Sequence, residues 1–348
     1  MQKKLIALAV AGLVSAPVFA QSNVTIYGLV DMGVSYRGDN IVNGVGSKTA
    51  IDSGMASGSR LGFRGVEDLG NGLKAGFVLE QGLNVDRGTS AQGGRSYGRQ
   101  SYLSLGGGFG TFILGRINTP QKNLQDAFDP FGGGTVGQMT NIYTQAVSRL
   151  DNTAAYITPN FGGLTVTAAY STQVSGQELV DNTGDVRAWA ISPRYTHGPL
   201  DIGPDYPRAK QHGVSGATAN KVWDLAAAYD LGVAKLSAMY GQNKDNPQWE
   251  KATFWMVGAT VPVGPAGKVL VSYNRAKAED VGANKDSGRS SQWALGYGHA
   301  LSKRTDIYTA YADINNKNED VIFADSGDSS NAGEGYQRGF NLGIRHRF

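Results

Sequence analysis

The chain has 348 residues, among them 49 glycines, 16 tyrosines and no cysteine. The lack of cysteine excludes disulfides and thiolate metal sites, and a net charge of +3 is too small to indicate a nucleic-acid-binding protein. Charged residues make up 18% of the chain, below the usual quarter. Low charge with abundant glycine and tyrosine favours many strands and tight turns over a helical fold.

Residues 1–20 have the pattern of a secretory signal peptide. Two lysines precede the apolar run LIALAVAGLV, and Val18 and Ala20 occupy the positions that a signal peptidase reads. A transmembrane anchor is the alternative, but the run is short and a cleavage site follows it. We therefore expect a mature chain, residues 21–348, that leaves the cytoplasm and forms one domain.

Alternating segments cover the mature chain. No stretch reaches the ~18 to 20 consecutive apolar residues that a spanning helix needs. Segments such as LTVTAAY, WALGYG and DIYTAYAD instead alternate in polarity, which is typical of barrel strands between lipid and a wet lumen. The sixteen predicted strands are 23–36, 58–68, 72–85, 98–106, 109–117, 152–159, 163–171, 186–196, 199–206, 222–230, 233–241, 252–262, 267–275, 291–300, 303–313 and 338–348.

The joints between these strands alternate in length. One set is short and built from turn residues, for example LGNG at 69–72 and HGP at 197–199. The other set is long and polar, for example 37–57 and 316–337. Seven short turns alternating with eight long loops indicate an even-stranded membrane barrel with both termini on its short-turn side. The fold of a soluble β-sandwich does not require short and long loops to alternate along the chain.

Four stretches in combination carry a family resemblance: SNVTIYGLVDMGVSY, SGSRLGFRGVEDLGNGLKAGFVLEQG, RQSYLSLGGGFGTFILGR and the closing GIRHRF. They resemble the general diffusion porins of Gram-negative bacteria, most closely the β-proteobacterial type. The resemblance implies an all-β fold, a 16-stranded antiparallel transmembrane β-barrel whose third external loop, residues 118–148, folds inward and narrows a water-filled pore. It also implies a homotrimer in the cell outer membrane, surrounded by lipid and lipopolysaccharide and inserted by the outer-membrane assembly machinery.

Alternation within the second and third predicted strands places three charged side chains in the lumen, namely Arg60, Arg64 and Glu80. A turn centred on Asn71 sets Glu80 opposite Gly62, and a turn centred on Gly72 sets it opposite Arg64. Either register brings Glu80 within direct or diagonal contact of a lumenal arginine. A surface ion pair on a soluble sheet is the alternative and would contribute little. Beside the low-dielectric walls of a pore, the same charges would sort ions.

Two further arginines are candidates for the pore. Arg149 ends the third loop, and alternation with Ala154 points it inward. Arg99 matches a basic residue near the start of the fourth strand in the porin family. Parity with Leu103 nevertheless points Arg99 outward and Gln100 inward. A bulge or the loop edge would be needed to turn Arg99 into the lumen.

The third loop contains LQDAFDPFGGGTVG at 124–137. This stretch resembles the constriction loop of porins, whose tip carries an acidic residue near proline, an aromatic residue and paired glycines. The resemblance makes Asp126 and Asp129 candidates for the acidic side of the constriction, facing Arg60, Arg64 and Arg149. A flexible surface loop with two solvated aspartates is the alternative.

The chain ends in FNLGIRHRF, which also alternates. Because an open sheet edge cannot persist in lipid, we expect this last strand to pair with the first. Phe340, Leu342 and Ile344 then meet lipid, and Phe348 lies at the interfacial aromatic girdle. The resemblance adds that such a terminus, with its final phenylalanine, is a recognition signal for the assembly machinery.

No motif indicates an enzyme, a metal or a cofactor. The four histidines lack paired ligand spacing, GVGSKT lacks the context of a phosphate loop, and no G-x-S-x-G is present. We expect passive diffusion of ions and small hydrophilic solutes, with weak anion preference because at least three lumenal or rim arginines face Glu80 and two loop aspartates. A substrate-specific channel, or a structural or adhesive barrel with a closed lumen, is the alternative.

Overall fold

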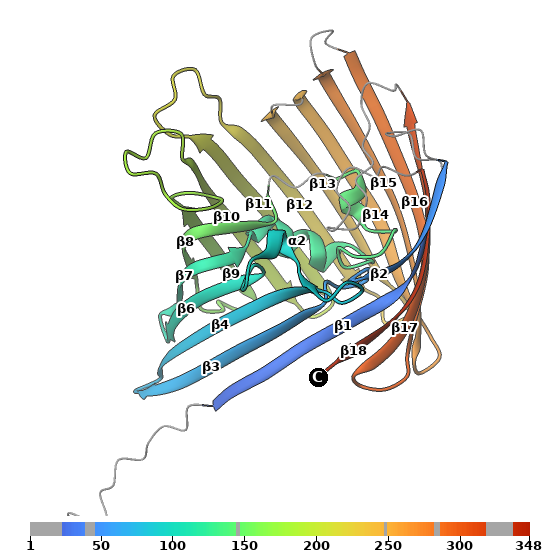
Figure 1. The fold of residues 1–348 in the computed structure, drawn as a ribbon, viewed down its shortest axis with the longest axis horizontal. Helices are drawn as coiled ribbons and strands as arrows, with labels where there is room; N and C mark the ends of the chain where they lie inside the picture. The colour runs from blue at the N-terminus through green and yellow to red at the C-terminus, as the bar shows by residue number, and fades with distance from the viewer. Residues whose placement is uncertain (1–22, 39–45, 144–146, 247–248, 282–285, 318–336) are drawn as a thin grey trace, which may run out of the picture.

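The computed structural model describes residues 23–38, 46–143, 147–246, 249–281, 286–317 and 337–348, so the expected signal peptide at 1–20 lies outside the described residues. Within them, sixteen long strands form a closed antiparallel barrel (Figure 1). Two shorter strands, β2 (Ser47–Ser53) and β5 (Thr89–Ser90), lie in loops. The sixteen are β1 (Asn23–Gly38), β3 (Arg60–Gly70), β4 (Leu73–Asn84), β6 (Gln100–Gly107), β7 (Gly110–Asn118), β8 (Arg149–Ile157), β9 (Leu164–Ser171), β10 (Val186–His197), β11 (Leu200–Gln211), β12 (Asn220–Asp230), β13 (Lys235–Asn246), β14 (Trp249–Val263), β15 (Gly267–Val281), β16 (Asp286–Ala300), β17 (Thr305–Lys317) and β18 (Arg338–Arg347).

The last strand closes the barrel against the first, as predicted. Met32 lies opposite Ile344 in the β1–β18 ladder, and Gly28 and Phe348 exchange two backbone hydrogen bonds of 3.1 Å. Leu342 is 52% exposed, whereas the adjacent Asn341 is 1% exposed, so the apolar residues of β18 point away from the lumen. The start of β1 and the end of β18 therefore lie at the end of the barrel that carries the short turns.

The turn between β3 and β4 sets the register of the charged strands. Asn71 and Gly72 have φ values of 51° and 77°, the left-handed pair that a tight two-residue hairpin requires. The turn pairs Gly70 with Leu73, and a β-bulge between Asp68 and Gly70 then shifts the ladder by one residue. Glu80 therefore lies opposite Gly62, which is the first of the two predicted registers.

Two joints that we expected to be long loops are mostly strand. β13 and β14 stay paired until Asn246 faces Trp249, and the β15–β16 ladder extends to the pair Val281 and Asp286. The polar residues there suggested loops, but charged side chains pair across these strands, as in Lys251 and Glu279 at 3.7 Å. Polar residues are tolerated in these strand ends because cross-strand partners and water satisfy them.

The barrel wall is uneven in height (Figure 1). The low wall, β6–β9, has strands of 8 or 9 residues, whereas β14, β15 and β16 in the tall wall, β12–β17, have 15 each. All five tryptophans lie in β10, β12, β14 and β16. Four of them pack against tyrosines of neighbouring strands in tilted pairs, with ring centroids 5.3 to 5.5 Å apart. Such an aromatic belt marks the membrane interface on this side of the barrel.

Residues 119–143 of loop 3 (119–148) lie against the inner face of β10–β17, and Figure 1 shows helix α2 (Pro120–Phe128) inside the ring of strands. Thr119 caps this helix, because its side chain accepts a bond from the backbone N–H of Lys122, and proline follows at the first helical position. Gln121 and Tyr143 donate to the carboxylate of Asp224 at 2.8 and 2.9 Å.

No helix among the described residues is long and apolar enough to cross a membrane.

An apolar cluster holds loop 3 to the wall. Phe128, Met139 and Ile142 are at most 1% exposed and pack on inward alanines of β12–β17 such as Ala252 and Ala294. Alanine leaves room beside the strands that a larger residue would fill. The tall wall is therefore shaped to receive the loop, and open space is left on the side of β3–β8.

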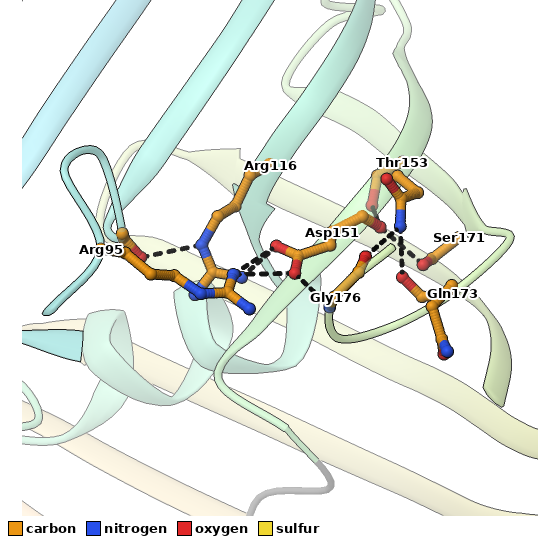
Figure 2. Close-up of polar contacts among 9 residues, drawn as sticks. Arg95, Arg116, Asp151, Thr153, Ser171, Gln173 and Gly176 are labelled. Atoms are coloured by element: carbon orange, nitrogen blue, oxygen red, sulfur yellow. Dashed lines mark hydrogen bonds and ion pairs between the residues drawn. The ribbon is translucent and has the colours of Figure 1, made fainter. Parts of the chain in front are cut away.

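A charged cluster ties other loops to the rim of the low wall (Figure 2). Asp151 of β8 accepts hydrogen bonds from Arg95, Arg116 and the backbone N–H of Gly176, the first at 2.8 Å and the last at 2.7 Å. Arg116 lies two residues after the exposed Leu114 and therefore on the same face of β7, so this cluster lies on the outer side of the barrel. It joins loop 2 (85–99) and loop 4 (172–185) to the wall and is separate from the lumen.

We predict that deleting Phe348 lowers the yield of folded barrel. The deletion removes two backbone hydrogen bonds at the seam and an aromatic ring at the membrane interface. The folded fraction, measured by heat-dependent mobility on detergent gels, should fall severalfold, while Phe348→Tyr should fold normally. Channels that do form should keep the wild-type conductance. A deletion variant that folds as well as the wild type would contradict the seam's role.

Candidate functional site

A polar cavity of about 440 Å³ lies between loop 3 and the wall of β3–β8. Its charged lining residues come from four segments that are distant in the sequence: the start of β3, the end of loop 2, α2 and the start of β8. They are Arg60, Arg99, Lys122, Asp126 and Arg149. The fold therefore brings together four of the predicted site residues and adds Lys122. Cations outnumber carboxylates in this lining.

Glu80 anchors the basic side of the cavity. Its Oε1 accepts a hydrogen bond from Arg99 Nε at 2.7 Å, and its Oε2 accepts one from Tyr27 Oη at 3.0 Å. Gly62 lies opposite Glu80, and the Tyr27 ring occupies the space that a side chain at Gly62 would need. Glu80 is 4% exposed, so its charge is held between these partners and is not presented to the lumen.

The expectation that Arg99 points outward is wrong. Arg99 lies in a bend immediately before β6, and its backbone N–H bonds to the carbonyl of Glu80 at 3.1 Å. The strand's alternation begins only at Gln100, so parity does not apply to Arg99. The bend turns its side chain toward the Glu80 carboxylate.

Arg60 and Arg149 complete a group of three guanidinium groups. Arg60 begins β3 and interacts electrostatically with both Arg99 and Glu80. Arg149 begins β8 and interacts with Arg99 and Glu80 as well. Among the described residues, the buried Nε of Arg149 has no hydrogen-bond partner. Three arginines thus share one carboxylate, which leaves excess positive charge on this side of the cavity.

The loop side of the cavity carries one cation and one anion. Lys122 Nζ and Asp126 Oδ2 are 2.8 Å apart, one helical turn from each other on α2. Asp126 therefore faces the cavity with its charge largely compensated. Sequence reasoning missed Lys122, although the threonine–proline start of a helix at Thr119 would have predicted α2. Spacing of four residues then places Lys122 and Asp126 on one face.

Asp129 does not face the arginines, so that prediction is wrong. It is 5% exposed, and its carboxylate accepts hydrogen bonds from the backbone N–H groups of Phe131, Gly133 and Met139 at 3.0 to 3.2 Å. Burial raises the pKa of Asp129 to about 6, which still leaves it ionised at neutral pH as an acceptor for these groups. Asp129 thus organises the loop's own backbone.

Arg64 lies outside the cavity lining. It is exposed on β3, and its guanidinium lies 5.1 Å from the centre of the Tyr27 ring. Because β3 runs from Arg60 to the tight turn at Asn71, Arg64 lies below the cavity toward the turn end.

The described residues contain no group of three or more His, Asp and Glu side chains arranged to hold a metal ion. The histidines are His197, His212, His299 and His346, on separate strands or loops. His346 is exposed on the outer face of β18, where its Nδ1 lies 2.9 Å from Thr305 Oγ1. That hydroxyl gives the imidazole a hydrogen-bond partner on the outer face, where Leu342 and Ile344 of the same strand are apolar.

Comparison with known proteins agrees with this architecture. A family model described as Gram-negative porin matches residues 7–319. The chain is 34% identical to outer membrane porin protein 32 of Delftia acidovorans and 29% identical to an outer membrane porin protein of Bordetella pertussis, over 100% of each chain. A solved structure, the anion-selective porin from Comamonas acidovorans, matches with a TM-score of 0.79 and 34% identity, covering 94% of this chain and 100% of that one. The chain belongs to the Gram-negative porins, the channel-forming proteins of the outer membrane.

Proposed function

We propose that this porin is a passive, water-filled diffusion channel with a weak preference for anions. The observation that carries the proposal is the convergence of Arg60, Arg99 and Arg149 on one cavity beside a single engaged carboxylate, Glu80. A relative at 34% identity that is named an anion-selective porin supports the same ion preference. Porins are channels, and we propose no catalytic role for this chain.

The mechanism follows from the position of these charges. A hydrated lumen spares a polar solute the cost of losing its water, and the space between loop 3 and the β3–β8 wall sets the size limit. Walls of low dielectric concentrate the field of the three arginines, so small anions are enriched there and cations are repelled. Lys122 and Asp126 on the opposite side nearly cancel, which keeps the preference weak.

We propose that the chain works as a homotrimer, with the low wall at the subunit interface. Strands of 8 or 9 residues tilted by about 45° rise only roughly 19 to 21 Å, which is less than the ~25 Å apolar band of outer-membrane barrels. The outer face of this wall is nevertheless strongly apolar, with Leu103 and Leu114 more than 60% exposed. A second copy of the chain would cover this face.

Export and assembly complete the proposal. We propose residues 1–20 as the signal peptide that carries the chain across the inner membrane. The exposed row of Phe340, Leu342, Ile344 and Phe348 suits recognition by the outer-membrane assembly machinery, because it is present in the chain before the barrel closes.

Reversal potentials in planar bilayers test the ion preference. Under a KCl gradient the reversal potential of the wild type should have the sign that indicates a preference for chloride over potassium. Arg149→Ser should reduce the chloride-to-potassium permeability ratio by about twofold, because it removes an uncompensated positive charge. Arg87→Ser is the matched control, since Arg87 is exposed in loop 2, pairs with Asp86 and does not line the cavity. It should leave the ratio unchanged.

The same recordings separate the alternatives. A clear cation preference in the wild type would overturn the proposed selectivity. A barrel with a closed lumen would give no single-channel conductance, and a substrate-specific channel would show saturable block of conductance by its substrate.

Two aspartates of loop 3 should differ in their effects. Asp129→Ala leaves three backbone N–H groups without their acceptor, so loop 3 should loosen, with higher conductance and more open-channel noise. Asp126→Asn removes only a lumenal charge and should strengthen the anion preference without added noise. Single-channel recording distinguishes these results, and equal noise in both variants would contradict the organising role of Asp129.

A charge on the low wall should prevent trimer formation. Leu114→Arg places a guanidinium where the wall meets a second subunit, at a cost of ~2 to 4 kcal/mol for an arginine on an apolar barrel surface. Leu295→Arg, at a position that is 49% exposed on the tall wall, is the matched control. Mass measurement in detergent should give monomers for Leu114→Arg and trimers for Leu295→Arg, whereas the reverse would place the interface on the tall wall.

A further inference from the structure

A second group of cations lies at the turn end of the lumen. Lys268 lies at the start of β15 after a short turn, and Arg345 and Arg347 lie at the end of β18. Lys268 shares its side of β15 with the buried Ser272, and Arg345 and Arg347 alternate with the exposed Ile344, so all three point inward. None of them lines the cavity described above.

One carboxylate, that of Asp306, forms ion pairs within this group of cations. Asp306 of β17 is bound by Arg345 through a two-point contact at 3.0 and 3.2 Å and by Arg347 Nη1 at 2.7 Å. Lys268 interacts electrostatically with Asp306 and with both arginines. Among the described residues, the Lys268 ammonium makes no hydrogen bond or close ion pair. The carboxylate is therefore already occupied by the two arginines, while Lys268 is exposed beside them.

The group is connected to the cavity above it. Arg345 Nη1 donates to Ser57 Oγ at 2.6 Å, and Ser57 lines the same cavity as Arg60. Arg345 also interacts electrostatically with Arg60. Basic side chains thus continue from the three-arginine group to the turn-end mouth. A solute that leaves the cavity toward this mouth passes Arg345 first and Lys268 and Arg347 next.

We propose that Lys268 and Arg347 form a second anion-binding station at the turn-end mouth, with small polyvalent oxyanions such as phosphates as its ligands. This inference rests on the anion preference proposed above and adds sidedness to it. An ammonium and a guanidinium with N–H groups still free are the donors that bind phosphate oxygens. Two weak binding sites in series allow an anion to enter at one site and to leave from the next, which is compatible with conduction.

Block of the open channel by inorganic pyrophosphate tests the station. Pyrophosphate added at the turn end should block the wild type at a lower concentration than when added at the loop end. Lys268→Gln should raise the half-blocking concentration about fivefold from the turn end and leave the loop-end value unchanged, because one charge is lost at that mouth only. Arg347→Gln should act in the same direction.

Two further variants control the measurement. Lys303→Gln removes a charge from the exposed turn at the same end and should change block less than twofold. Because the chain has no cysteine, Lys303→Cys can carry a single biotin, and its capture by streptavidin identifies the turn-end compartment. Heat-dependent mobility and single-channel conductance show that each variant is folded.

The outcomes separate the station from the channel's selectivity. If Lys268→Gln leaves pyrophosphate block unchanged, or changes it equally from both sides, while the wild type keeps an anion-type reversal potential, the station is wrong and the proposed function stands. A cation-type reversal potential in the wild type overturns the proposed function itself.

Discussion

The structure depends on the need to pair every backbone N–H and C=O group within the membrane. Because lipid offers no hydrogen-bond partners, a sheet can persist there only when its edges are joined. The pairing of β18 with β1, completed by the bonds between Gly28 and Phe348, meets this need. Closure also fixes two environments, so that successive side chains of each strand face lipid or lumen in turn.

The position of the ion path follows from a difference between the two sides of the barrel: loop 3 packs on one side and leaves the other side open. Inward alanines of the tall wall leave space that Phe128, Met139 and Ile142 fill, and Asp224 binds Gln121 and Tyr143 of the same loop. Loop 3 is therefore held to one side. The open cavity remains against β3–β8, where the strands carry arginines. Packing on one wall thus decides which charges a permeating ion meets on the other.

Compensation between charges sets the strength of the field in the lumen. Glu80 holds Arg99, Asp126 pairs with Lys122, and Asp306 holds Arg345, so much of the positive charge is balanced locally. Arg60, Arg149 and Lys268 have no comparable partner among the described residues. These three positions, two beside the cavity and one at the turn end of the lumen, carry much of the net positive character. A weak preference for anions results, without strong binding that would stop the flow of ions.

The sequence by itself determined the barrel, its strand count, the pairing of its ends and the lumenal side of Arg60 and Glu80, because these follow from a period of two and from turn residues such as Asn71 and Gly72. Only the tertiary structure decided the roles of Arg99, Asp129 and Lys122. Arg99 lies in a bend where alternation has not begun, and Asp129 turns to backbone N–H groups of its own loop. Strand periodicity is a local property of the chain, whereas the conformation of a loop depends on the wall against which it packs.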